Sequence, residues 1–195
     1  IKQHSVNIVE PSTKFTASPI VTQPLCNLQS GSATISAQGG VSPYQYWLSG
    51  NTPGSNNTIS NIPAGNRTLF ARDSFQCLVT MNIILVNPPA LNLLHNKTEN
   101  TCFGDSVGII NLIPSGGKRP YQFNINAGAF GADSVFRKLA AGNYSFILRD
   151  SAGCEKTLQT NLIARQPILT TITTTPESCI GAKNGTATAV VSGGT

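Results

Sequence analysis

The sequence predicts an all-β protein made of tandem small immunoglobulin-like β-sandwich domains, arranged head to tail, with a repeat of about 77 residues. Three observations predict this fold class. Apolar residues alternate with a period of two, and no helical period is sustained. The 195 residues include 18 Gly and 12 Pro, which supply frequent turns. Finally, a set of matched features recurs along the chain at a nearly constant spacing.

The cysteines mark the repeat most clearly. Cys102 lies 76 residues after Cys26, and Cys179 lies 77 residues after Cys102. Cys154 likewise lies 77 residues after Cys77. Cys26, Cys102 and Cys179 are each followed by an alternating segment and a Gly-Gly pair. Because several independent features share one spacing, chance is a poor explanation.

These matches divide the chain into about two and a half copies of the unit. We expect residues 1–11 to be the last strand of a preceding repeat, 12–88 to be repeat domain 1 and 89–167 to be repeat domain 2. Residues 168–195 should be the first strands of a truncated repeat domain 3. A lone strand or a two-stranded stub cannot bury its apolar face, so the pattern indicates a piece of a longer chain.

Within the second copy, alternation and turn signals predict seven short strands. Turn chemistry comes from Gly-Gly-Lys-Arg-Pro, Ala-Ala-Gly-Asn and Asp-Ser-Ala-Gly. The expected strands are 91–99, 107–114, 121–126, a weak one near Ala129, 134–139, 144–149 and 156–163. This number of strands in about 77 residues is typical of a small immunoglobulin-like sandwich.

One face of these strands should form the core of each copy, because successive side chains point to opposite faces. In the second copy the inward residues should be Ile110, Leu112, Tyr121, Phe123, Ile125, Tyr144, Phe146 and Leu148. Their equivalents in the first copy are Ala33, Ile35, Tyr44, Tyr46, Leu48, Leu69 and Ala71.

Composition excludes several function classes. Charged residues make up only 11% of the chain, against roughly 25% in an average soluble domain, so the polar surface must consist mainly of Thr, Ser, Asn and Gln. The net charge of +5 comes from scattered basic residues, which does not favour binding to nucleic acid. No apolar run approaches the roughly 18 residues of a membrane span, and no signal-peptide pattern opens this stretch.

The motifs shared by the two copies also carry a family resemblance. A cysteine is followed by Gly-Gly-x-x-Pro-Tyr, then by Ala-Gly, then by Asp-Ser-x-x-Cys, as at Gly39–Tyr44, Ala64-Gly65 and Asp73–Cys77. This pattern resembles the SprB-type repeat of giant cell-surface adhesins in gliding Bacteroidota and of related proteins exported by the type 9 secretion system. The resemblance implies an extracellular, outer-membrane-associated protein at the cell surface. Its partners would be neighbouring repeats and, through other regions, the gliding or secretion machinery.

The sequence departs from the family pattern at two places. The family usually has Trp two residues after its second aromatic residue, where this chain has Leu48 and Ile125. Trp47 is one residue out of register and should face away from the core. The family also has Tyr two residues after the glycine of Ala-Gly; Tyr144 fits, but Arg67 in the first copy should weaken the contact that the Tyr makes.

No catalytic, metal-binding or cofactor motif stands out. His4 and His95 lie near predicted domain edges without an acidic neighbour in the sequence, and no nucleotide-binding or zinc-binding signature occurs. We therefore expect no enzyme activity, no metal and no cofactor. Asp73 and Asp150 stand at strand ends, where an Asx-turn cap is favoured over a metal site. Trp47 is a candidate surface contact, such as a platform on which a sugar stacks.

Three functions compete: a rigid extracellular stalk, a polysaccharide-binding repeat module, and spacer domains attached to a type 9-secreted enzyme. The positions that match between copies are turns, glycines, cysteines and core residues, whereas the outer faces differ, as Trp47 against Asn124 shows. A repeated binding site would need repeated surface residues. We therefore favour the stalk.

The cysteines allow more than one pairing. In the predicted topology the first and second Cys of one copy lie at opposite ends of the sandwich, roughly 20–25 Å apart, whereas a disulfide needs Cα atoms within about 7 Å. We therefore prefer an inter-domain bond between Cys26 and Cys154, with Cys77, Cys102 and Cys179 pairing with other copies. The alternatives are the intra-domain pairs Cys26–Cys77 and Cys102–Cys154, which leave Cys179 alone, and free thiols.

The resemblance to Bacteroidota proteins also implies candidate O-glycosylation sites. The phylum attaches O-glycans at a short Asp-Ser/Thr-aliphatic sequon, which this chain matches at Ser106, Ser134 and Ser151. The opposing interpretation is that Asp-Ser simply favours turns.

Overall fold

The structure, a computed structural model, describes residues 13–194. Within this part of the chain there are 14 β-strands and no helix. The chain falls into two compact units. The first comprises residues up to 90 together with 152–154, and the second comprises 91–151 and the residues from 155 onward. The strand predicted at residues 1–11 lies outside the described residues.

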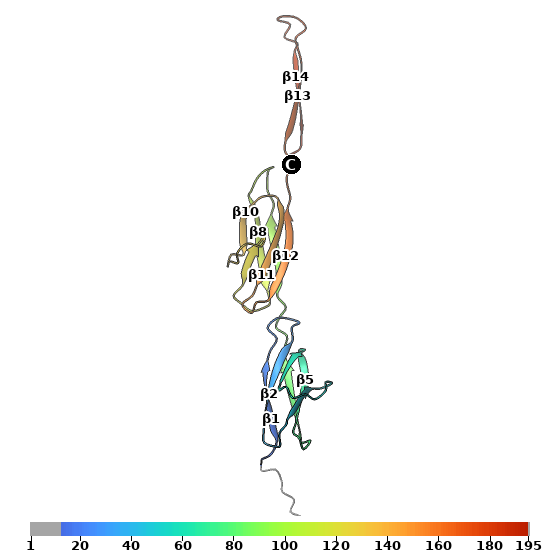
Figure 1. Cartoon of the computed structure of the whole chain (residues 1–195). Helices are drawn as coiled ribbons and strands as arrows, with labels where there is room; N and C mark the ends of the chain where they lie inside the picture. Colours follow the sequence, from blue (N-terminus) through green and yellow to red (C-terminus); the bar gives the residue numbers. More distant parts are fainter. Residues whose placement is uncertain (1–12, 195) are drawn as a thin grey trace, which may run out of the picture. The chain divides into compact units, whose positions relative to one another are not determined.

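The first unit is a β-sandwich of two antiparallel three-stranded sheets, with orders β1-β2-β4 and β3-β5-β6 (Figure 1). Its core is formed by buried apolar side chains from both sheets, including Ile35 of one sheet and Leu69 of the other. The strands are β1 (Thr16–Thr22), β2 (Gly31–Gln38), β3 (Gln45–Leu48), β4 (Thr58–Ile62), β5 (Gly65–Arg72) and β6 (Leu78–Leu85).

The second unit contains a sandwich of the same design, with sheets β10-β8-β7 and β12-β11-β9 (Figure 1). Its strands are β7 (Asn92–Thr98), β8 (Gly108–Ser115), β9 (Gln122–Ile125), β10 (Val135–Leu139), β11 (Gly142–Arg149) and β12 (Glu155–Leu162). The fold class predicted from the sequence, tandem small immunoglobulin-like sandwiches, is therefore confirmed.

The weak strand predicted near Ala129 does not form, so this sandwich has six strands rather than seven. Asn126 and Ala127 have φ values of 48° and 59°, which is the left-handed region and turns the chain out of the extended conformation. Only an isolated bridge between Phe123 and Gly131 remains there.

The burial patterns repeat strand by strand. Strands β2 and β8 share one alternating pattern, and β5 and β11 share another. In the second copy the predicted core residues Ile110, Leu112, Phe123, Phe146 and Leu148 are buried. The other predicted inward residues of both copies, including Tyr44 and Tyr121, are buried or half-buried and pack against the cores.

A two-stranded hairpin follows the second sandwich in the sequence. β13 (Leu169–Thr175) pairs antiparallel with β14 (Thr186–Ser192), in the range expected to start a third copy. All side chains of both strands are exposed. This agrees with the expectation that two strands alone cannot bury an apolar face.

The corner that follows β10 in the second copy and β4 in the first copy corrects one expectation. The Tyr144 hydroxyl donates to the Ala140 carbonyl at 2.8 Å. In the first copy Arg67 does not lose this contact: its Nε donates to the Pro63 carbonyl at 3.0 Å and its Nη2 to the Ala64 carbonyl at 2.9 Å. The guanidinium is long enough and has enough donors to replace the phenol.

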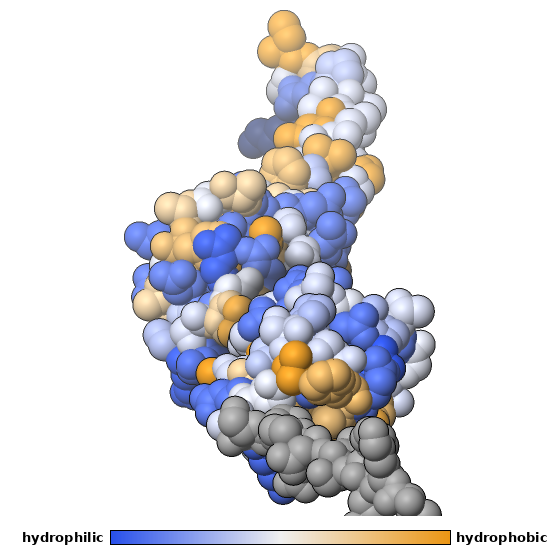
Figure 2. Space-filling view, turned by 60° about the horizontal axis from the view of Figure 1, so that its bottom comes forward, coloured by the Kyte–Doolittle hydropathy of each residue, from blue (hydrophilic) through white to orange (hydrophobic). Residues whose placement is uncertain are grey.

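The surface is largely polar, with separate groups of apolar residues. Figure 2 shows one face, on which hydrophobic residues form small orange groups among hydrophilic ones. Exposed apolar side chains include Leu28, Phe75 and Leu94. No helix of the described part is long and apolar enough to cross a membrane.

Candidate functional site

The turn between β5 and β6 of the first unit holds a buried carboxylate in a network of hydrogen bonds. Asp73 is only 2% exposed. Its Oδ1 accepts a hydrogen bond from the Cys77 backbone N–H at 2.8 Å, and its Oδ2 accepts one from the Val41 N–H at 3.1 Å. The Ser74 hydroxyl donates to the Val41 carbonyl at 3.0 Å. The turn is thereby tied to the Gly-Gly segment that follows β2.

Glycine is required at this contact. Gly40 has a φ of 63°, and a Cβ placed on it would lie 2.6 Å from Oδ2 of Asp73. A side chain here would therefore face both a strained backbone and a steric clash with the carboxylate. Only glycine lets the backbone approach the buried carboxylate this closely.

The second copy repeats the arrangement. Oδ2 of Asp150 accepts a hydrogen bond from the Lys118 N–H at 2.8 Å, and a Cβ on Gly117 would lie 2.6 Å from the same oxygen. The Ser151 hydroxyl donates to the carbonyls of Lys118 and Arg119, at 3.1 and 2.9 Å. Asp73 and Asp150 thus serve as caps, as expected, and the two serines that lock the loop were not foreseen. Their signal in the sequence is the Asp-Ser pair that recurs in both copies.

Burial by itself would raise the pKa of Asp73, but hydrogen bonds from the backbone N–H groups of Val41, Cys77 and Phe75 outweigh it and hold the pKa below its ordinary value. A carboxylate with a lowered folded-state pKa stabilises the fold above its unfolded pKa of about 3.9 and loses that contribution as the pH falls through the folded pKa. We expect Asp73→Asn to be less stable at pH 7 and to lose part of the acid dependence below about pH 4. Urea unfolding midpoints between pH 2 and 7 measure this.

The exposed Asp133 provides the matched control for that measurement. Asp133→Asn removes the same charge without removing a buried hydrogen-bond acceptor, so its acid dependence should follow that of the wild type. Parallel pH profiles for Asp73→Asn and the wild type would contradict the role assigned to the Asp73 carboxylate.

The loops that carry the first cysteine of each copy share one turn. The carbonyls of Cys26, Cys102 and Cys179 each accept a backbone N–H three residues later, at 3.1, 3.4 and 3.1 Å. In the second copy Asp105 strengthens the turn, since its Oδ2 accepts from the Thr101 hydroxyl at 3.0 Å and the Cys102 N–H at 2.9 Å.

One disulfide is present among the described residues. It joins Cys26 to Cys154, with Cα atoms 5.6 Å apart and a sequence separation of 128 residues. Cys154 lies between β11 and β12, but residues 152–154 belong to the same compact unit as Cys26. Cys77, Cys102 and Cys179 are exposed free thiols. The alternative pairs Cys26–Cys77 and Cys102–Cys154 are not formed in this structure.

The three candidate glycosylation serines differ in their surroundings. Ser106 is exposed, in the loop that carries Cys102. Ser134 is half-buried, and its carbonyl accepts the Leu112 N–H at 2.8 Å. Ser151 is exposed, but its hydroxyl is the donor that locks the turn after β11.

Trp47 lies outside the core, on the other face of its sheet, as expected. Its ring stacks on Phe70 with centroids 5.3 Å apart, and the Arg72 guanidinium lies 5.5 Å from the ring centroid. In the second copy the equivalent arginine, Arg149, lies 3.8 Å from the centroid of Phe130. The protein's own side chains therefore pack on these aromatic rings. The contact of Arg149 with Phe130 was not predicted.

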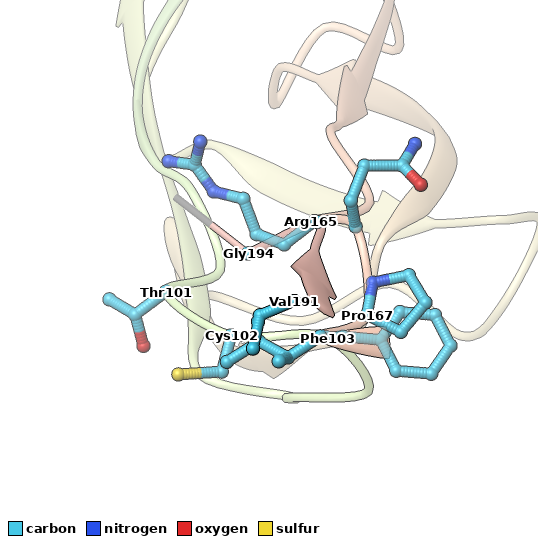
Figure 3. Close-up of a pocket in the computed structure, with 10 residues that line it drawn as sticks. Thr101, Cys102, Phe103, Arg165, Pro167, Val191 and Gly194 are labelled. Atoms are coloured by element: carbon cyan, nitrogen blue, oxygen red, sulfur yellow. The ribbon is translucent and has the colours of Figure 1, made fainter. Parts of the chain in front are cut away.

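A pocket of about 480 Å³ opens in the second unit (Figure 3). Its walls come from the Cys102 loop, from the segment before β13 and from the end of β14. The lining residues are Thr101, Cys102, Phe103, Arg165, Gln166, Pro167, Ile168, Val191, Gly193 and Gly194.

One of the two histidines can be placed, and it lies beside a hydroxyl. Nε2 of His95 lies 2.9 Å from the Thr160 hydroxyl, and His4 is outside the described residues. Within residues 13–194 there is no group of three or more His, Cys, Asp or Glu side chains that could hold a metal ion.

Comparison with known proteins finds a repeat family that matches two regions of the chain. The model of the SprB repeat family matches residues 18–52 and 95–130, so the resemblance seen in the sequence is confirmed in both copies. No match was found among curated proteins. Among solved structures, the chain is similar to a C-terminal 282-residue fragment of intimin, crystallised in complex with the intimin-binding domain of the translocated intimin receptor. The identity is 14% and the TM-score 0.41, and the match covers 81% of this chain and 66% of the other.

Proposed function

We propose that this chain, which carries two SprB repeats, is a stalk segment of an adhesin-like cell-surface protein, in which disulfides staple consecutive repeats together. The observation that carries the proposal is the bond between Cys26 and Cys154. It joins the first-cysteine loop of one copy to the second-cysteine turn of the next.

The disulfide changes the route that a pulling force takes through the chain. A load applied to the two ends passes from Cys26 directly to Cys154 through the disulfide. The strands β2 to β11 lie inside the closed loop, so the covalent path of the load bypasses their backbone while the bond is intact. The repeats can therefore hold an adhesive tip away from the cell without being unravelled.

The repeated features support a scaffold rather than a repeated ligand site. The positions that both copies share are the Gly-Gly segment, the buried Asp, the locking Ser and the cysteines. The aromatic surface of Trp47 is used by Phe70 and Arg72, and its equivalent in the second copy is the buried Asn124. This weighs against a polysaccharide-binding module, and we expect no enzymatic turnover by these repeats.

Single-molecule pulling on the full chain tests the stalk. With the bond intact, the chain between the two cysteines, which are separated by 128 positions in the sequence, cannot extend. On reduction, unfolding should release about 420–460 Å of additional contour length, at 3.3–3.6 Å per residue. Cys26→Ser should release this length without reductant, whereas Cys77→Ser, which removes a free thiol, should behave as the wild type. Equal extension with and without reductant would overturn the stapled stalk.

We also propose, from the family resemblance, that the protein is exported by the type 9 secretion system of a gliding bacterium of the Bacteroidota and displayed on its outer membrane. Protease added to whole cells should then cleave the chain, while a periplasmic marker stays intact. Protection of the chain in intact cells would contradict surface display.

Ser106 is the serine that we propose for O-glycosylation. It follows Asp105 and is exposed, whereas the Ser151 hydroxyl is already hydrogen-bonded to two carbonyls. Mass spectrometry of host-made protein should find a glycan on the peptide that contains Ser106, and Ser106→Ala should remove it. Ser151→Ala is the matched control. A bare Ser106 peptide from the native host would contradict the assignment.

A further inference from the structure

The pocket beside Cys102 combines two features that belong to different copies of the repeat. One side presents Cys102, the equivalent of Cys26. Another side presents Gly194 and Ile168, which are the equivalents of Gly117 and Leu91 one repeat earlier. A Cβ on Gly194 would lie 3.1 Å from the Ile168 side chain, just as one on Gly117 would lie 2.8 Å from Leu91.

In the complete copies, the Asp of the Asp-Ser-x-x-Cys turn covers the second glycine of the Gly-Gly pair. Oδ2 of Asp73 lies against Gly40, and Oδ2 of Asp150 lies against Gly117. No residue of the described chain takes this place at Gly194, where the neighbours of a Cβ would come from Ile168 alone. The side of the pocket at Gly194 can therefore receive the Asp of such a turn in the same way as Gly40 and Gly117 do.

The last residue of the same turn contacts the preceding copy. Cys154 ends the turn that starts at Asp150, and it is bonded to Cys26. Its Sγ also lies 3.5 Å from the Leu25 carbonyl. The equivalents of Leu25 and Cys26 are Thr101 and Cys102, both of which line the pocket. The side of the pocket at Thr101 and Cys102 can therefore receive the Cys of such a turn, as Leu25 and Cys26 receive Cys154.

We propose that this pocket is a socket for the Asp-Ser-x-x-Cys turn of a further SprB repeat, with the turn's Asp against Gly194 and its Cys bonded to Cys102. The inference rests on the proposed stapled stalk and names the partner at its next junction. The occupant is specific because the pocket presents a thiol and a bare glycine backbone together. A turn of this motif supplies a thiol and a carboxylate four residues apart, as at Asp73 and Cys77.

The bond forms by thiol–disulfide exchange with a disulfide oxidant such as oxidised glutathione. The Cys102 thiolate attacks one sulfur of the oxidant and releases one reduced glutathione. The thiolate of the incoming turn then attacks the Cys102 sulfur of the mixed disulfide and releases the second. Two thiols are oxidised to one disulfide, and one oxidised glutathione is reduced to two thiols.

The test extends the full chain so that the third copy is complete. Residues 119–167 are repeated after Thr195, which stands where Lys118 stands in the second copy. After refolding in a glutathione redox buffer, peptide mapping without reduction should find Cys102 linked to the added copy of Cys154. Alkylation of Cys102 should fall about tenfold or more relative to the unextended chain, because docking raises the effective thiol concentration to the millimolar range or above. Changing the added cysteine to serine is the matched control and should leave Cys102 reactive.

Two results would overturn the socket. One is a link between Cys179 and the added cysteine, which is pairing within a copy. The other is an unpaired Cys102 in an extended chain that has folded, judged by protected amides in its added strands. The core of the completed third copy would be built partly from residues 168–194. A second extension therefore replaces residues 168–195 by another copy of 91–167, a sequence that already folds in this chain. The same two results would overturn the socket in this second extension.

The socket and the stapled stalk fail in different ways. If the Cys26–Cys154 bond is absent from the oxidised native chain, the stapled stalk itself is wrong. If that bond forms and Cys102 stays unpaired in both extended chains, only the socket is wrong.

Discussion

Replacing Cys26 with serine is expected to lower the free energy of unfolding by up to about 5 kcal/mol. The disulfide closes a loop across a sequence separation of 128 residues. In the chain-entropy account, a cross-link over so long a loop removes much of the conformational freedom of the unfolded chain. Urea unfolding of the oxidised protein, followed by tryptophan fluorescence and circular dichroism, measures the loss.

The free thiols provide the control for this substitution. Cys77 is exposed and forms no disulfide, and serine keeps a side-chain donor at this position, so Cys77→Ser should change the free energy of unfolding by no more than about 0.5 kcal/mol. Reduction of the wild type should reproduce the loss seen with Cys26→Ser. If the serine variant is as stable as the oxidised wild type, the bond does not constrain the unfolded chain and the proposed staple loses its energetic basis.

Asn100→Ala is expected to have the next largest effect. Asn100 is 1% exposed, and its Oδ1 accepts the backbone N–H groups of Val107 and Gly108, both at 2.9 Å. Alanine would leave both donors without a partner, at a cost of about 2–4 kcal/mol. Because these bonds close the loop that carries Cys102, amide exchange in residues 101–107 should also become faster. Urea unfolding and hydrogen exchange measure the two effects.

Asn96→Ala is the matched control, since Asn96 is exposed on the neighbouring strand β7. Its free energy of unfolding should stay within about 0.5 kcal/mol of the wild type. Unchanged exchange in the Cys102 loop of Asn100→Ala would show that the loop is held by other contacts, and would contradict the role given to this side chain.

The strands and the core were predictable because they depend on local chain geometry. Side chains alternate between the two faces of a strand, so the spacing of Ile110 and Leu112 predicted their burial without any knowledge of their partners. The internal repeat then carried the same assignment to Ala33 and Ile35. The seventh strand near Ala129 was wrong because backbone conformation at Asn126 and Ala127 left no extended segment there.

Hydrogen bonds made by individual side chains were less predictable. Arg67 makes this corner contact in the first copy because its guanidinium reaches the Pro63 carbonyl, the equivalent of the Ala140 carbonyl to which Tyr144 donates. Asn100 escaped notice because a buried amide is distinguished from an exposed one only by its neighbours. The locking role of Ser74 likewise depends on Val41, which lies more than thirty residues earlier.

The sequence alone was enough to predict a tandem array of small β-sandwiches, since strand alternation, turn residues and repeat spacing are all local or periodic properties of the chain. The cysteine spacing and the predicted strand order favoured Cys26–Cys154 but left the intra-domain pairs and free thiols open. The tertiary structure selected Cys26 and Cys154, because a disulfide requires proximity in space and a separation of 128 residues carries no information about distance.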